Sequence, residues 1–312
     1  MKKNILIIGA CGQIGSELTE KLRTEYDPNR VIAADIRSSN ESVVDSGPFE
    51  LLDATDYEAV QDLCLNYDIE DVYLMAAMLS ATGEKFPMKA WHLNMQSLLN
   101  VLSLGRDKKI KKIFWPSSIA VFGPDSPKQN TPQNCYTNPN TVYGISKLSG
   151  EQWCAYYHQK FNVDVRSIRY PGLISWKTAP GGGTTDYAVE IYHEALQHDK
   201  YTCFLNESTR LPMMYMDDAI RATTDLMNAP AENISVRTSY NLSGTDFTPQ
   251  EQAESIRKHL PKFKIDYAPD YRQAIADSWP ESIDDSVAKN DWNWQPKFDL
   301  EKITEIMLKN LS

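Results

Sequence analysis

Tyr143 and Lys147 stand four residues apart and are the residues of this chain best suited to acid–base chemistry. Side chains at that spacing lie on the same face of a helix, so a lysine ammonium would lie beside a phenol. A tyrosine has a pKa near 10, and a positive charge within about 4–6 Å of it favours the phenolate. The pair therefore predicts a tyrosine general base.

A serine completes the expected catalytic set. Ser118 follows the apolar run at 112–116, which predicts a strand, and it would position the hydroxyl group of a substrate. Lys147 would in addition hydrogen-bond the ribose of a nicotinamide nucleotide. A Tyr–Lys pair alone is common on helix surfaces. The prediction therefore depends on the strand that ends at Ser118 and on a glycine loop at the start of the chain.

Gly9, Gly12 and Gly15 form that loop, directly after the apolar run at 5–8. Between a strand and a helix, glycines at such a spacing are typical of dinucleotide binding. The first glycine permits a tight turn, the second lets the backbone approach a diphosphate, and the third lets the helix pack on the strand. The free N–H groups and the dipole at the helix N-terminus favour the anion.

An acidic residue at the end of the second expected strand indicates NAD. Asp35 stands 20 residues after Gly15, where a carboxylate accepts hydrogen bonds from the adenosine ribose. It would repel a 2′-phosphate by roughly 4 kcal/mol at a separation of about 4 Å. Arg37 complicates this choice, because NADP sites use arginine. Asp53 and Ala54 are expected at the edge of the adenine, and a simple helix cap is the alternative interpretation of Asp53.

Strand and helix patterns alternate along most of the chain. Continuous apolar runs suit strands that are buried on both faces of a parallel sheet. The expected strands are 5–8, 30–35, 49–52, 72–77, 112–116, 165–170 and 240–242, and the expected helices are 16–26, 57–66, 91–104, 143–161, 187–198 and 249–260. This alternation predicts an α/β fold with a doubly wound parallel sheet of the Rossmann type. We expect 1–172 with 213–248 to form it, and 173–212 with 249–312 to form a smaller, interleaved substrate-binding domain.

The composition is that of an ordinary globular protein, with 312 residues, 42% hydrophobic and 24% charged. The 32 basic and 42 acidic residues give a formal net charge of −10, which argues against nucleic acid or an anionic membrane as the main partner. No stretch approaches the roughly 20 apolar residues that span a bilayer. The five cysteines include no CxxC pair, so neither a metal site nor a disulfide framework is expected, and reduced thiols suit the cytoplasm.

These features resemble the extended short-chain dehydrogenase/reductase superfamily, from the glycine loop to the residues at 290–296. Within that superfamily the chain is most similar to the short-chain type of NAD-dependent L-threonine 3-dehydrogenases. The similarity rests on the segments at 76–80, 115–118, 183–190, 211–216 and 279–282. The resemblance implies a cytoplasmic homodimer that uses NAD to oxidise the side-chain hydroxyl of L-threonine to 2-amino-3-ketobutyrate.

The motifs and the resemblance together define an expected site. Its catalytic residues are Ser118, Tyr143 and Lys147. The expected cofactor contacts are Gly9, Gly12, Gln13, Ile14, Gly15, Asp35, Arg37, Asp53, Ala54, Ala76, Ala77, Asn94, Tyr143, Lys147, Tyr170 and Pro171. The expected substrate contacts are Ser80, Ser118, Tyr143, Gly183, Thr184, Thr185 and Trp279. The backbone at 181–183 and nearby hydroxyls would hold the substrate carboxylate, Trp279 would cover its methyl group, and which of the two threonines points inward stays open.

Two other functions stay open at this point. A nucleotide-sugar epimerase or dehydratase shares the fold and the Tyr–Lys pair. Such an enzyme must bind a diphosphate substrate, and it usually does so with arginines of the C-terminal half. After Gly172 this chain has five arginines, and two of them fall on predicted helices with solvent-facing patterns. A non-catalytic NAD-binding protein would tend to lose the tyrosine or the lysine, and both are present here.

Overall fold

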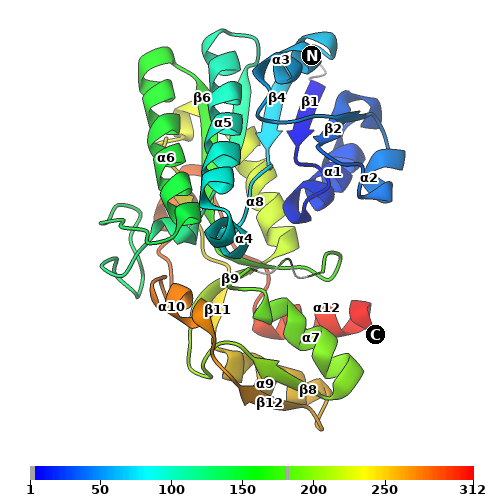
Figure 1. Cartoon of the computed structure of the whole chain (residues 1–312), viewed down its shortest axis with the longest axis vertical. Helices are drawn as coiled ribbons and strands as arrows, with labels where there is room; N and C mark the ends of the chain where they lie inside the picture. The colour runs from blue at the N-terminus through cyan, green and yellow to red at the C-terminus, as the bar shows by residue number, and fades with distance from the viewer. Residues whose placement is uncertain (1–3, 180, 182) are drawn as a thin grey trace.

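A seven-stranded, all-parallel sheet forms the centre of the computed structural model, which describes residues 4–179, 181 and 183–312 (Figure 1). Its strands lie in the order β10-β6-β5-β4-β1-β2-β3. They are β1 (Asn4–Ile8), β2 (Val31–Asp35), β3 (Phe49–Leu51), β4 (Ile69–Leu74), β5 (Lys112–Ser118), β6 (Asp164–Tyr170) and β10 (Tyr240–Asn241). The order reverses between β1 and β4, as in a Rossmann fold. The predicted fold class is confirmed, and Gly182 of the predicted glycine triplet lies outside the described residues.

The bounds predicted for β4, at 72–77, were wrong. The strand ends at Leu74, because the chain turns there over the end of β1. The N–H groups of Met75 and Ala76 both donate to the carbonyl oxygen of Ile8, at 2.7 and 3.0 Å. The following residues therefore leave the sheet and become part of a cleft wall.

Helices cover both faces of the sheet. On one face lie α1 (Gln13–Glu25) and α8 (Met216–Asn228), and on the other lie α3 (Tyr57–Asn66), α5 (Pro87–Arg106) and α6 (Val142–Phe161). Two short helices, α2 (Glu41–Asp45) and α4 (Ser80–Lys85), follow β2 and β4. The helix predicted at 91–104 begins earlier, at Pro87, because proline is favoured in the first turn, where its missing N–H has no partner to lose.

The remaining elements pack around a separate hydrophobic core. This unit contains α7 (Tyr187–His198), β8 (Lys200–Cys203), α9 (Pro249–His259), β12 (Lys264–Tyr267), α10 (Tyr271–Asp277) and α12 (Leu300–Leu311). A three-stranded sheet of β7 (Gly172–Ile174), β9 (Leu211–Tyr215) and β11 (Thr245–Phe247) lies between the two units (Figure 1). One more helix, α11 (Ser286–Trp292), places Trp292 in the core on the α1 and α8 side of the large sheet. The division into 1–172 with 213–248 and 173–212 with 249–312 remains our proposal.

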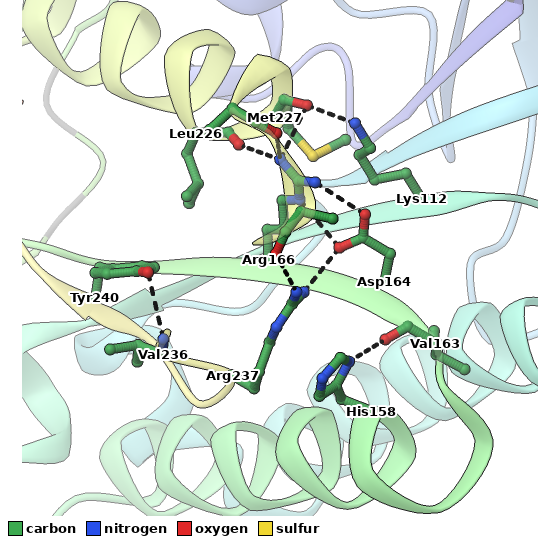
Figure 2. A network of polar contacts seen from close by, with 12 residues as sticks. Lys112, His158, Val163, Asp164, Arg166, Leu226, Met227, Val236, Arg237 and Tyr240 are labelled. Carbon is green, nitrogen blue, oxygen red and sulfur yellow. Dashed lines mark hydrogen bonds and ion pairs between the residues drawn. The ribbon is translucent and has the colours of Figure 1, made fainter. Parts of the chain in front are cut away.

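Two cationic side chains hold the last turn of α8 at the amino-terminal ends of β5 and β6 (Figure 2). Arg166 is 2% exposed; its guanidinium donates to the carbonyl oxygens of residues 226 and 229, at 2.6 and 2.7 Å, and pairs with Asp164 at 2.9 Å. Lys112 donates to the carbonyl oxygen of residue 227 at 2.7 Å. The last carbonyls of a helix have no partners within it, so these contacts fix α8 on the strands that end at Ser118 and Tyr170.

Three further properties bear on the predictions made above. Across the described ranges, no helix is long and apolar enough to cross a membrane. The same ranges contain no group of three or more His, Cys, Asp or Glu side chains that could hold a metal ion. All five cysteines are free thiols.

Candidate active site

A cleft runs along the carboxyl ends of the central strands, and its two halves share Met75, Ala77 and Leu79. One half is lined by the predicted cofactor residues Gly9, Gly12, Asp35, Arg37, Asp53, Ala54, Ala76 and Ala77. The other half, which we call the catalytic pocket, is lined by Gln13, Ile14, Ala77, Ser80, Ser118, Tyr143, Lys147, Tyr170, Pro171, Gly183, Thr184, Thr185 and Trp279. Ligands bind at this edge of open parallel sheets, at the switch in strand order.

The three glycines of the loop have different neighbours. A Cβ on Gly9 would lie 2.5 Å from the N atom of Ala76, and Gly9 has a φ of +86°. A Cβ on Gly15 would lie 2.1 Å from the carbonyl oxygen of Gly9, so Gly15 serves helix packing rather than the cleft lining. A Cβ on Gly12 would meet only that same oxygen, at 3.3 Å. The open side of Gly12 therefore faces the cleft.

The glycine loop leads into α1 without a side-chain cap. Gly12 is the N-cap residue, and no side chain accepts the first N–H groups of the helix. Such free N–H groups, together with the helix dipole, form a site for an anion. The cradle around Gly12 fits the diphosphate of a dinucleotide.

Two carboxylates line the same half of the cleft as this cradle. Asp35 Oδ2 accepts the N–H of Cys11 at 2.9 Å, which ties the end of β2 to the glycine loop. Asp53 Oδ1 accepts both the hydroxyl and the N–H of Thr55, at 2.7 and 2.9 Å, and these hydrogen bonds lower its pKa. Asp53 thus caps the turn before α3 and also lines the cleft. The helix cap of α3 is Asp56 rather than Asp53, and a contact of Asp53 with the adenine stays a prediction.

The predicted catalytic residues come together from β5 and α6. α6 begins next to them because Thr141 caps it, its hydroxyl accepting the N–H of Gly144 at 3.1 Å. Lys147 is 2% exposed, and its Nζ donates to the carbonyl oxygen of Pro116 at 2.5 Å. That Nζ lies 5.5 Å from the centre of the Tyr143 ring. The i, i+4 spacing therefore places the two side chains together as predicted.

The electrostatics of the pair differ from the expectation that the lysine lowers the pKa of the tyrosine. Burial raises the pKa of Tyr143 to about 12, and a hydrogen bond with Ser118 acts in the opposite direction. Burial likewise lowers the pKa of Lys147 to about 7, opposed by Cys154 and Glu151. Desolvation thus disfavours both charged forms. A base at neutral pH needs a further positive charge in the pocket.

The catalytic pocket distinguishes the two threonines. Thr184 is 1% exposed, and its Oγ1 is buried without a hydrogen-bond partner among the residues that the structure describes. Thr185 is half-buried, and its side chain lies against Gly172. A buried polar atom without a partner is costly, so Thr184 is prepared for a polar group of a ligand. Trp279 forms an apolar wall of the same pocket.

Asp186 is a pocket residue that the sequence reasoning missed. It lines the catalytic pocket, and its Oδ2 accepts the N–H of Gly183 at 2.7 Å. The available signal was its position directly before α7, which the sequence suggested only as a helix start. Asp186 therefore fixes the backbone of Gly183, next to Thr184, and places a carboxylate in the pocket.

Asn94 is a predicted cofactor residue whose side chain bonds to other parts of the protein. Its Oδ1 accepts the N–H of Met78 at 2.8 Å, and its Nδ2 donates to Met78 O at 3.2 Å and to Ser146 Oγ at 3.1 Å. It does not line either half of the cleft. In this structure Asn94 joins the loop after β4 to α5 and α6.

Known proteins share this arrangement. The NAD dependent epimerase/dehydratase family matches residues 5–243. An uncharacterized epimerase/dehydratase of Staphylococcus haemolyticus is 49% identical over 309 residues, which are 98% of this chain and 97% of that one. Among solved structures, the GalE-like L-threonine dehydrogenase of Cupriavidus necator in its holo form is 55% identical, with a TM-score of 0.97, covering 99% of this chain and 100% of that chain. A monomeric L-threonine 3-dehydrogenase from a metagenome is 50% identical, with a TM-score of 0.93 and 98% of each chain covered.

The likeness extends over nearly the whole chain, and the family match includes the glycine loop, the Tyr–Lys pair and the strands that hold them. The chain therefore belongs to the NAD dependent epimerase/dehydratase family.

Proposed function

We propose that this chain is an NAD-dependent L-threonine 3-dehydrogenase, which oxidises the side-chain hydroxyl of L-threonine to 2-amino-3-ketobutyrate. The observation that carries the proposal is the catalytic pocket, where the unpartnered Thr184 hydroxyl and the Asp186 carboxylate lie with Ser118, Tyr143 and Lys147. A small zwitterion needs both of its charges paired when buried. The relatives named as threonine dehydrogenases support the same substrate.

The roles follow from position. Ser118 orients the substrate hydroxyl, Tyr143 Oη accepts its proton, and Lys147 stands behind the phenol, fixed by the carbonyl of Pro116. NAD, when bound, supplies the hydride acceptor and a nicotinium charge that favours the phenolate. Thr184 binds the carboxylate of the substrate, and Trp279 covers its methyl group. Asp35, at the adenosine end, disfavours a 2′-phosphate and so NADP.

The arginines weigh against a nucleotide-sugar substrate. Arg210, Arg221, Arg237 and Arg272 pair with carboxylates of their own neighbourhood, and Arg257 donates to the carbonyl of Phe263. None of these five side chains lines either half of the cleft. A second diphosphate would therefore lack the bidentate donors that such ligands require.

We further propose a cytoplasmic homodimer, formed by a second copy of this chain on the outer faces of α5 and α6. These helices lie side by side (Figure 1) and carry the exposed aromatic side chains Trp91, Trp153 and Tyr156. Exposed apolar patches mark interaction sites. Light scattering should give twice the chain mass of 35.5 kDa, and Trp153→Glu should halve it. Leu65→Glu, on exposed α3 surface, is the control, and a monomer like the metagenome relative would refute the dimer.

The function is tested by turnover with NAD. L-threonine should be oxidised and UDP-glucose should not react. Tyr143→Phe should lower kcat by about 10²–10⁴-fold, the contribution of a general base, and leave NADH binding intact. Tyr271→Phe, at an exposed tyrosine far along the chain, is the matched control. Activity within tenfold of wild type in Tyr143→Phe would remove Tyr143 from the role of base.

A further inference from the structure

A buried ion pair lies directly behind the catalytic residues. Glu151 stands on α6 one turn after Lys147 and two turns after Tyr143, so the three share a helix face. Its carboxylate accepts hydrogen bonds from Arg169 Nε at 2.9 Å and Nη2 at 2.7 Å, and from Ser117 Oγ at 2.6 Å. Glu151 is fully buried and Arg169 nearly so. The proposed reaction assigns neither of them a role.

The pair connects the elements that hold the catalytic residues. Ser117 precedes Ser118 on β5, and Arg169 precedes Tyr170 on β6. Arg169 Nη1 donates to the carbonyl of Gln133 at 3.0 Å, within the connection that leads from β5 to α6. Lys147 is fastened to the neighbouring carbonyl of Pro116. Helix α6 is therefore tied to the end of β5 at two successive residues.

We propose that Glu151 and Arg169 are positioning residues of the catalytic pocket. The pair fixes α6 against the end of β5, and Glu151 neutralises the guanidinium so that no unopposed positive charge lies behind the catalytic residues. A buried ion pair contributes little more stability than apolar residues of the same volume, which argues for a role beyond stability. The inference rests on the proposed function, because it concerns the same reaction.

The surrounding groups leave Glu151 as the neutralising charge. The described titratable groups near the pair and the catalytic residues are Cys154 on α6, Cys135 next to Arg169, Glu84 of α4, which contacts the start of α6, and Asp186 in the catalytic pocket. Burial raises the pKa of the Cys154 and Cys135 thiols, so both are neutral. Glu84 and Asp186 accept backbone N–H groups of residues 142 and 183 and do not contact Arg169.

Glu151→Gln tests the charge, because it keeps the size of the side chain. α6 rises about 1.5 Å per residue, which places residue 151 about 12 Å from Tyr143 along the axis. The guanidinium of Arg169, left unopposed beside residue 151, favours the phenolate, and at about 12 Å and an effective dielectric constant near 20 it lowers the pKa of Tyr143 by up to about one pH unit. The same change lowers the pKa of Lys147, because Glu151 opposes that fall in the wild type, so part of the effect on Tyr143 is offset. We expect the acidic limb of kcat/KM for L-threonine to move to lower pH by about half a unit to one unit.

The double variant Glu151→Gln/Arg169→Met removes both charges and should return the limb to its wild-type position. Arg166→Met is the matched control: it also removes a buried, paired arginine of β6, so the unfolding temperature should fall while the limb stays in place. A limb that does not move in Glu151→Gln, or stays shifted in the double variant, overturns the inference.

Glu151→Asp tests the positioning by itself and serves if Glu151→Gln does not fold. It keeps the charge but shortens the reach to Arg169 and Ser117, so kcat should fall several-fold with the limb unmoved. An unchanged kcat in this variant overturns the positioning role. NADH binding, followed by fluorescence, should persist in every variant. Wild-type protein that does not oxidise L-threonine would refute the proposed function, separately from the inference on this pair.

Discussion

Gly12→Ala should weaken dinucleotide binding about 10- to 150-fold without unfolding the protein. Gly12 has a φ of −77° and a ψ of 174°, which alanine adopts freely, and its Cβ would meet only the carbonyl oxygen of Gly9. Replacing glycine by alanine at a compatible position stabilises by about 0.4–1 kcal/mol. Replacing the glycine of an N-cap by alanine lowers the free energy of unfolding by about the same amount. The unfolding temperature should therefore stay within about 3 °C of wild type.

Binding should respond much more strongly, because the added methyl group points into the cleft where the diphosphate must approach the backbone. Losing one backbone hydrogen bond to a charged group costs about 1.5–3 kcal/mol, which corresponds to about a 10- to 150-fold increase in the Kd of NADH. NADH fluorescence titration measures this Kd, and thermal unfolding of the same samples measures stability.

Gly15→Ala is the matched control. Its Cβ would lie 2.1 Å from the carbonyl oxygen of Gly9, so α1 must shift, and overpacking of this kind costs about 1–3 kcal/mol. This variant should lose stability and binding together, with the unfolding temperature lower by about 3–10 °C. An unchanged Kd in Gly12→Ala would refute the assignment of this loop to the diphosphate. Equal losses of stability in both variants would refute the distinction between the two glycines.

Three further outcomes follow from the pocket. Asp35→Ser should narrow the preference for NAD over NADP, measured as the ratio of kcat/KM; an unchanged ratio would contradict the role of this carboxylate. Thr184→Val should raise KM for L-threonine about 10-fold or more, as expected for one lost hydrogen bond to a charged group, and Thr185→Val should do less; the reverse order would contradict the geometry. L-Serine lacks one methyl group and should react about 10–200-fold less efficiently than L-threonine. L-allo-threonine should not be oxidised, because with its inverted centre it cannot direct the hydroxyl toward the base and the hydride toward NAD at the same time.

Local signals in the sequence determined the framework of the site. The glycine loop lies between a strand and a helix within 15 residues, and Tyr143 and Lys147 share a face because four residues make about one helical turn. Such patterns depend on neighbours along the chain, so they predict the fold class and the catalytic residues before any packing is known. The bounds predicted for β4 were wrong because hydrogen bonds to β1 set the end of this strand. Met75 donates to Ile8, which lies 67 residues earlier in the chain.

Only the tertiary structure decided which side chains are available to a ligand. The side chain of Asn94 donates a hydrogen bond to Ser146, which is 52 residues away in the chain. The carboxylate of Glu151 accepts one from Arg169, which is 18 residues away. Thr184 and Thr185 are adjacent and alike in sequence, yet the Thr184 hydroxyl is buried without a partner among the described residues, whereas Thr185 lies against Gly172. The sequence by itself therefore determined the elements and the chemistry they carry, and the fold decided the partners, because hydrogen bonds and burial depend on which distant segments pack together.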